Sequence, residues 1–269
     1  MATDLPSAAP PPLEGQVLFY TNPEPLDSKR HERLAMRSTD RPYTFAAKQH
    51  FCPLQVGEFA PSAVNYPIIF AGEANAPLAI MGLNEGENLF IQPDGLYRIG
   101  AYVPTFMRRY PFVVARDGER MVICIDRPFG LFVEVNDPSE LEEGGVMLFE
   151  NGQPSEFTQR CMEFCRQFDI DAHRTQSFIQ LLTDLDLFEP RQTNYAPRQP
   201  NGELGPSQLI AEYKAVSEEK LRALPNEKKL ELQENGALAQ IHAHLISLHN
   251  WDKLISETVA RQNPRPANA

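Results

Sequence analysis

The sequence predicts an α+β protein, with an antiparallel-rich β N-terminal region followed by a helical C-terminal region that ends in a long helix. Up to about residue 150, short apolar runs alternate with Pro, Gly and Asn, as is typical of strands and turns. After Pro154, apolar residues recur at steps of three and four, which is the spacing of one helix face. We therefore expect a disordered tail over 1–14, a β-rich region over 15–150, a helical region packed on it over 151–262, and a tail over 263–269.

The strands of the β-rich region are predicted from apolar runs between turn residues. Tyr66–Ala71 and Leu78–Leu83 lack polar alternation, which predicts strands covered on both faces. Asp117-Gly118 stands between two β-branched runs and predicts a hairpin. Further short strands are expected at 16–20, 88–91, 131–135 and 146–149, and a short helix near 58–64.

The helical region is predicted as several separate elements. Phe157 to Phe168 and Phe178 to Leu185 indicate two helices, and a loop rich in Pro, Asn and Gln is expected from Glu189 to Pro206. A short strand is then expected at Leu209–Lys214, and Ser217 is a candidate helix N-cap. The final helix, from Ala237 to about Arg261, is predicted to be the longest.

Composition excludes several classes of function. The formal charge of −11 is opposite to the clustered positive charge of a nucleic-acid surface. No run approaches the roughly 18 apolar residues that a membrane span needs, so we expect no membrane insertion. The N-terminus lacks the basic and apolar segments of a signal peptide, and four cysteines are few for 269 residues. These features predict a cytoplasmic protein with reduced thiols.

No motif in the sequence identifies a catalytic, metal or cofactor site. His242, His244 and His249 invite a metal interpretation, but none of their spacings places two ligands one helical turn apart. We therefore expect surface or interface histidines, with His249 or His242 able to hydrogen-bond Asp252. The isolated His31 is expected in a solvated loop or at an edge. No cofactor is predicted.

The stretch Gly100–Val114 has the most unusual composition in the chain. It contains Tyr102 and Tyr110, two prolines and the adjacent pair Arg108 and Arg109. Guanidinium groups suit carboxylates and phosphates, so either arginine could bind an anionic ligand. We expect a central strand here, which would point the two arginines to opposite faces. The favoured alternative is that one arginine pairs with Glu58, Glu87 or Asp126 and the other lies at the surface.

The chain resembles the bacterial SapC family from about Val17 to Leu254. The segments that carry the resemblance are Phe19-Tyr20 with Pro25-Leu26, Glu58-Phe59, Tyr66–Phe70, Gly82-Leu83, Glu87–Phe90, Tyr102-Val103-Pro104, Arg108–Phe112, Cys124–Asp126, Leu148-Phe149 and His244 to Asn250. The family name implies a link to the bacterial surface layer, and the resemblance implies genomic association with outer-membrane receptors. It supplies no catalytic residues.

We therefore predict a non-enzymatic cytoplasmic binding or accessory protein that recognises a peptide or a partner protein in a cell-envelope or nutrient-uptake context. Aromatic residues, prolines and arginines suit the recognition of extended ligands. The candidate ligand-binding residues are Arg108, Arg109, Tyr102, Tyr110, His249 and Asp252. One alternative is an enzyme for a small anionic or peptide substrate, with a pocket between the β region and the helices. Another is a surface-layer structural component, and a homo-oligomer is possible in each case.

Overall fold

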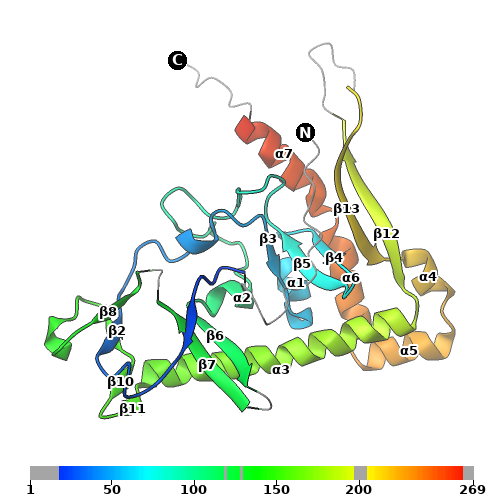
Figure 1. The fold of residues 1–269 in the computed structure, drawn as a ribbon. Coiled ribbons are helices and arrows are strands. Elements are labelled where there is room, and N and C mark those ends of the chain that lie inside the picture. Colours follow the sequence, from blue (N-terminus) through cyan, green and yellow to red (C-terminus); the bar gives the residue numbers. More distant parts are fainter. Residues whose placement is uncertain (1–17, 118–119, 128–129, 197–204, 263–269) are drawn as a thin grey trace, which may run out of the picture.

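A computed structural model describes residues 18–117, 120–127, 130–196 and 205–262. The predicted tails over 1–14 and 263–269 lie outside this part of the chain, as do the first two residues of the strand expected at 16–20. The described residues form a mixed α+β structure with antiparallel sheets, as the sequence predicts, and end in a long, bent helical segment (Figure 1).

A five-stranded antiparallel sheet lies at the centre of the larger core. Its strand order is β12 (Phe188–Tyr195), β13 (Gln208–Val216), β4 (Ile68–Ala71), β5 (Ala76–Ile80) and β3 (Phe51–Pro53). The two expected buried strands are confirmed in β4 and β5, which pair from Ile68↔Ala79 to Ala71↔Ala76. Every residue of β4 except Ala71 is buried, which explains its uninterrupted apolar sequence.

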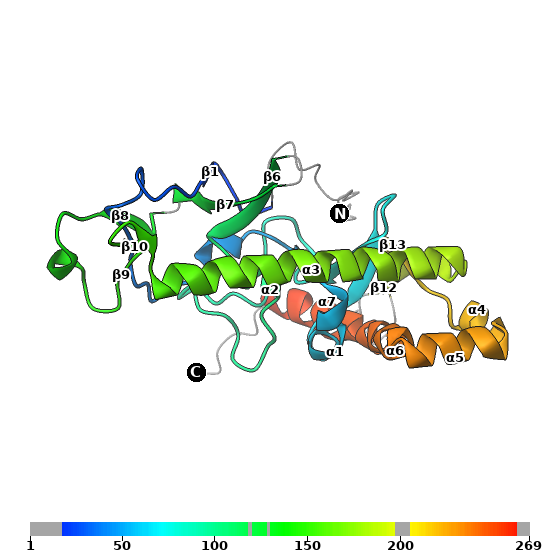
Figure 2. The same ribbon diagram turned by 90° about the horizontal axis from the view of Figure 1, so that it is seen from below.

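Helices cover this sheet and connect it to the rest of the molecule. α1 (Phe59–Ser62), α6 (Ala237–Ser247) and α7 (Asn250–Gln262) pack beside it, and α3 (Glu156–Asp184) crosses the length of the molecule (Figure 2). The Ser247 hydroxyl accepts the Ile68 N–H at 2.9 Å, which fastens α6 to β4. α4 (Glu218–Ala223) and α5 (Asn226–Glu234) precede α6, and Ser217 caps α4 through the Lys220 N–H as expected.

Three smaller sheets lie beside the N-terminal half of α3. Phe112, Ile125, Leu34, Leu148 and Cys165 form a second, separate apolar cluster between these sheets and the helix. The strands pair in the orders β1-β7-β6, β8-β2-β9 and β10-β11. Their bounds are β1 Pro23–Pro25, β2 Leu34–Met36, β6 Phe112–Asp117, β7 Arg120–Asp126, β8 Phe132–Glu134, β9 Val146–Met147, β10 Phe149–Glu150 and β11 Gln153–Pro154, with 3-10 turns at Thr44–Ala46, Val56–Glu58 and Pro138–Glu140.

The β6–β7 hairpin is confirmed by its register, which runs from Phe112↔Ile125 to Asp117↔Arg120. Its two turn residues, 118 and 119, lie outside the described residues. The strand expected at 131–135 is confirmed as β8, and the strand expected at 146–149 is divided between β9 and β10.

Two helix predictions are wrong in their extent. The pair of helices expected over Phe157–Leu185 is one 29-residue helix, α3, capped by the Ser155 hydroxyl, and it is the longest in the described structure. The final segment is bent, because α6 ends at Ser247 and α7 begins at Asn250. The spacing of the apolar residues continues from α6 into α7, so the sequence pattern alone does not show where one helix ends and the next begins.

The loop predicted from Glu189 to Pro206 is wrong for its first seven residues. Glu189–Tyr195 belong to β12, which pairs along its whole length with β13. Polar residues are tolerated there because β12 is an edge strand, and Pro190 is compatible with such a position. The C-terminal region therefore contributes two strands to the same sheet as β4 and β5, through Lys214↔Phe70.

Three further predictions are corrected. Residues 88–91 form a turn rather than a strand, because the Asn88 side chain accepts a hydrogen bond from the Phe90 N–H at 2.9 Å. A single β-bridge joins Ile91 to Tyr97. His31 is not solvated: it is 1% exposed, and its Nδ1 accepts the Asp27 N–H. The stretch Gly100–Val114 is not a continuous strand, since a short helix, α2 (Thr105–Arg108), precedes β6.

Candidate functional site

The buried carboxylate of Glu58 organises the segment that the sequence singles out. Its oxygens accept hydrogen bonds from the Thr105 N–H at 2.7 Å, the Thr105 hydroxyl at 2.6 Å and the Tyr102 hydroxyl at 2.9 Å. A fourth bond, from the Gln55 N–H at 2.9 Å, fixes Glu58 to its own 3-10 turn. Because the carboxylate receives the first N–H of α2, it starts a helix where the sequence predicts a strand. We call residues 102–110 together with Glu58 the α2 corner.

Arg108 lies on the exposed side of the α2 corner. Its guanidinium sits over the rings of Tyr102 and Phe164, with its central carbon 5.7 and 5.6 Å from the two ring centroids. It donates to the Tyr102 hydroxyl at 3.2 Å and forms no ion pair with a described carboxylate. Burial, with Glu58 as a second cause, raises the pKa of Tyr102 to about 12, so this phenol stays protonated and bridges the arginine to the carboxylate.

Arg109 is buried, with 7% of its surface exposed. Its guanidinium carbon lies 4.3 Å from the centroid of Phe106 and 4.2 Å from that of Phe168, and the Tyr20 ring is 5.6 Å away. The buried Nε has no hydrogen-bond partner, and Arg109 forms no ion pair with a described residue. The two arginines therefore lie in opposite environments, as expected, but they stand at the end of helix α2 rather than on a strand. The expected structural ion pair with Glu58, Glu87 or Asp126 is not formed.

Tyr110 leads from the α2 corner into β6. Its ring stacks on Phe45 with centroids 4.1 Å apart, and its hydroxyl donates to Asp126 at 3.1 Å. Asp126 is fully buried and also accepts hydrogen bonds from the Thr21 N–H, the Thr21 hydroxyl and the Asn22 N–H. Burial and the Asp126 charge raise the pKa of Tyr110. This second carboxylate thus ties the chain entering β1 to the end of β7.

His249 and Asp252 are both exposed, at the bend between α6 and α7 and in the first turn of α7. No contact between them, or between either of them and Arg108 or Arg109, occurs among the described residues. The expected hydrogen bond from a histidine to Asp252 is therefore not formed. The buried histidine of this segment is His244, whose Nε2 accepts the Val216 N–H at 3.1 Å. Burial lowers the pKa of His244 to about 4, so its ring is neutral and structural.

Two apolar side chains near the α2 corner are unusually exposed. Ile99, three residues before Tyr102, is 94% exposed, and Val64 is 66% exposed. Asn65, next to Val64, accepts the Tyr102 N–H at 3.0 Å, which places the end of α1 against the corner. The end of α1 and the chain that leads to Tyr102 therefore each expose an apolar side chain.

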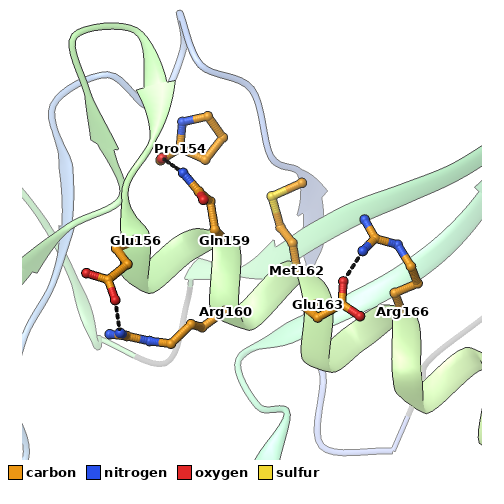
Figure 3. A pocket seen from close by; sticks show the side chains of 7 residues that line it. All are labelled: Pro154, Glu156, Gln159, Arg160, Met162, Glu163 and Arg166. Carbon is orange, nitrogen blue, oxygen red and sulfur yellow. Dashed lines mark hydrogen bonds and ion pairs between the residues drawn. The ribbon is translucent and has the colours of Figure 1, made fainter.

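A shallow groove of about 500 Å³ lies at the beginning of α3 (Figure 3). Its charged side chains pair with one another, Arg160 with Glu156 at 2.6 Å and Arg166 with Glu163. Gln159 donates to the Pro154 carbonyl, and Met162 lies between the two ion pairs in the view. Because these charges are already paired, the groove offers little to an ionic ligand.

The described residues contain no cluster of three or more His, Cys, Asp or Glu that could hold a metal ion, and no described helix has the length and apolar character of a membrane span. The four cysteines are free. Sequence reasoning missed Glu58 as the organiser of α2 and His244 as the buried histidine. The capping box of Gln55 and Glu58 indicates only the local 3-10 turn and not the contact of Glu58 with α2.

The fold and the site define an α+β protein whose least usual feature is an arginine-bearing aromatic corner built on a buried carboxylate. The SapC family model matches residues 26–254, which is most of the 269-residue chain, and the chain therefore belongs to the SapC family. No curated protein and no solved structure matches the chain.

Proposed function

We propose that this SapC-family chain is a non-enzymatic binding or accessory protein that takes a peptide or a partner protein at the α2 corner. The observation that carries the proposal is Arg108, an exposed cation held over Tyr102 and Phe164 with no carboxylate partner among the described residues. Arginine and aromatic residues are enriched at the centres of protein interfaces, where they supply most of the binding energy.

The construction of the corner supports the same proposal. The charge of Glu58 is engaged by four internal hydrogen bonds, so it holds Tyr102 and α2 in place rather than facing a ligand. Binding surfaces gain affinity when their anchors are fixed before the ligand arrives, because less conformational entropy is then lost. Ile99 and Val64, which are close to Tyr102 and to its partner Asn65 in the sequence, add exposed apolar side chains.

The proposed setting is the cytoplasm, in service of the cell envelope or of nutrient uptake. Four free cysteines, of which Cys52, Cys124 and Cys165 are buried, are compatible with a reducing compartment. The link to the envelope comes from the family name alone. A folded accessory protein with a recognition surface could serve the cell envelope or nutrient uptake.

The proposal is tested with a displayed library of random peptides, selected on the purified full chain. We expect enriched peptides to bind the wild type, and we expect Arg108→Ala to weaken their binding at least tenfold, which is the usual effect of truncating an anchor arginine. Isothermal titration measures both affinities.

The matched control is Arg174→Ala, which removes an exposed arginine that pairs with Asp171 on α3. This control should bind the selected peptides as the wild type does. Equal binding by Arg108→Ala and the wild type, or equal losses in Arg108→Ala and Arg174→Ala, would show that the α2 corner is not the recognition surface.

A further inference from the structure

The guanidinium of Arg109 is buried and forms no ion pair with a carboxylate among the described residues. It is enclosed by Phe106 and Phe168 at 4.3 and 4.2 Å, and its Nε has no partner. Two arginines that are more exposed do form ion pairs. Arg98, at 36% side-chain exposure, holds Glu257 at 2.6 Å, and Arg127, also at 36%, holds Glu134 at 3.0 Å.

The Tyr20 hydroxyl accepts a hydrogen bond from the Arg109 side chain, but this neutral phenol does not supply a negative charge. Tyr20, Cys52 and Cys165 are close enough for the arginine to lower their pKa values, but burial has the larger opposite effect on each. The pKa of Cys165 is raised to about 11, so this thiol is neutral at physiological pH. The buried carboxylates Glu58 and Asp126 are engaged by other donors and form no ion pair with Arg109.

An uncompensated buried charge is costly, and cation–π contacts offset only part of that cost. An apolar side chain of similar length between two phenylalanine rings would avoid the cost altogether. Phe168 is only half-buried, so the guanidinium lies close to the surface on the side of α3. A buried arginine that forms no ion pair with a described carboxylate is best explained by a carboxylate that arrives with a ligand.

We propose that Arg109 binds a carboxylate of the recognised peptide, in an inference that rests on the proposed function of the α2 corner. The fork of a guanidinium matches a carboxylate with two parallel hydrogen bonds, and enclosure by two rings strengthens that pair. Arg108 attracts the acidic ligand at the surface, and Arg109 fixes the carboxylate. The carboxylate belongs either to the C-terminus of the peptide or to an Asp or Glu side chain.

The probes are three random heptapeptide pools, measured by fluorescence polarisation against the full chain. The first pool has free C-termini and no Asp or Glu, the second has the same composition with amidated C-termini, and the third has amidated C-termini with Asp and Glu included. Binding of the first pool but not the second identifies a terminal carboxylate. Binding of the third pool but not the second identifies acidic side chains.

The variants are Arg109→Met, which fills the space between the rings without charge, and Arg109→Lys, which keeps the charge but loses the fork. We expect Arg109→Met to lose binding of the carboxylate pool at least tenfold and to melt no lower than the wild type, and Arg109→Lys to bind with intermediate affinity. Circular dichroism gives the melting temperatures.

The remaining outcomes overturn the inference in distinguishable ways. Peptide binding that survives in Arg109→Met but is lost in Arg108→Ala leaves the proposed function standing and removes the role of Arg109. Marked destabilisation of Arg109→Met with unchanged binding by Arg109→Lys shows that the arginine is structural. If the first and second pools bind equally and the third pool binds no more tightly, the group that Arg109 recognises is not a carboxylate. No binding of any pool by the wild type overturns both proposals.

Discussion

The five-stranded sheet with α6 and the α2 corner both bury polar side chains, but they use them differently. Against the sheet, His244 and Ser247 are uncharged and bond to the backbone of Val216 and Ile68, so they fasten a helix to two strands. At the corner, Glu58 is bonded four times whereas Arg109 has no counter-charge. The first region uses these buried polar groups to join secondary-structure elements, and the second contains the cation on which the proposed carboxylate site depends.

The largest effect on stability is expected from Glu58→Ala. The variant leaves the Thr105 and Gln55 N–H groups without their acceptor and removes the start of α2, at a cost of roughly 3–5 kcal/mol in the free energy of unfolding. Urea denaturation measures this loss. Glu85→Ala, at an exposed position in the loop after β5, is the control and should change stability by less than about 0.5 kcal/mol. Similar losses in the two variants would contradict the organising role of Glu58.

The sheet region should respond to acid through His244. Its pKa in the folded protein is lowered to about 4, against an ordinary value of 6.5, so the unfolded chain binds the proton first. Stability from the neutral ring is complete above pH 6.5 and declines as the pH falls toward 4, by roughly 3 kcal/mol. Denaturation at a series of pH values should show this decline in the wild type and in His242→Gln, which alters an exposed histidine. If His244→Gln retained the same decline, another group would have to cause it.

A smaller loss is expected from Asp126→Asn. The amide keeps the shape of the carboxylate but presents an NH₂ group to donors such as the Thr21 and Asn22 N–H groups, at a cost of roughly 1–3 kcal/mol. Thermal unfolding measures the change. Asp252→Asn alters an exposed carboxylate and should unfold as the wild type does. A wild-type melting temperature for Asp126→Asn would show that these bonds contribute nothing net.

The smallest effect on stability is expected from Arg108→Ala. The exposed guanidinium makes one side-chain hydrogen bond and two ring contacts, so its loss should change the free energy of unfolding by no more than about 0.5 kcal/mol. The same variant is expected to lose peptide binding, as described above. A large loss of stability would show that Arg108, like Glu58, is needed for the fold. The α2 corner would then not differ from the sheet region in the role of its polar side chains.

Several features of the fold could be predicted because they depend on short stretches of sequence. The apolar runs of β4 and β5, the Asp-Gly hairpin of β6 and β7, and the Ser217 cap of α4 each carry their own local signal. β12 could not be predicted, because its residues are polar and its strand conformation depends on pairing with β13. α2 could not be predicted either, since the carboxylate that begins it comes from Glu58, 47 residues earlier in the chain.

The sequence by itself determined the α+β class, the family and the stretch that contains the candidate site, because periodicity, composition and motif are properties of the chain in order. Only the tertiary structure decided that Arg108 is exposed, that Arg109 is buried between Phe106 and Phe168, and that His249 and Asp252 are not in contact with either. Burial and charge pairing depend on residues far apart in the sequence. Which arginine is buried without an ion pair can therefore be known only once the chain has folded.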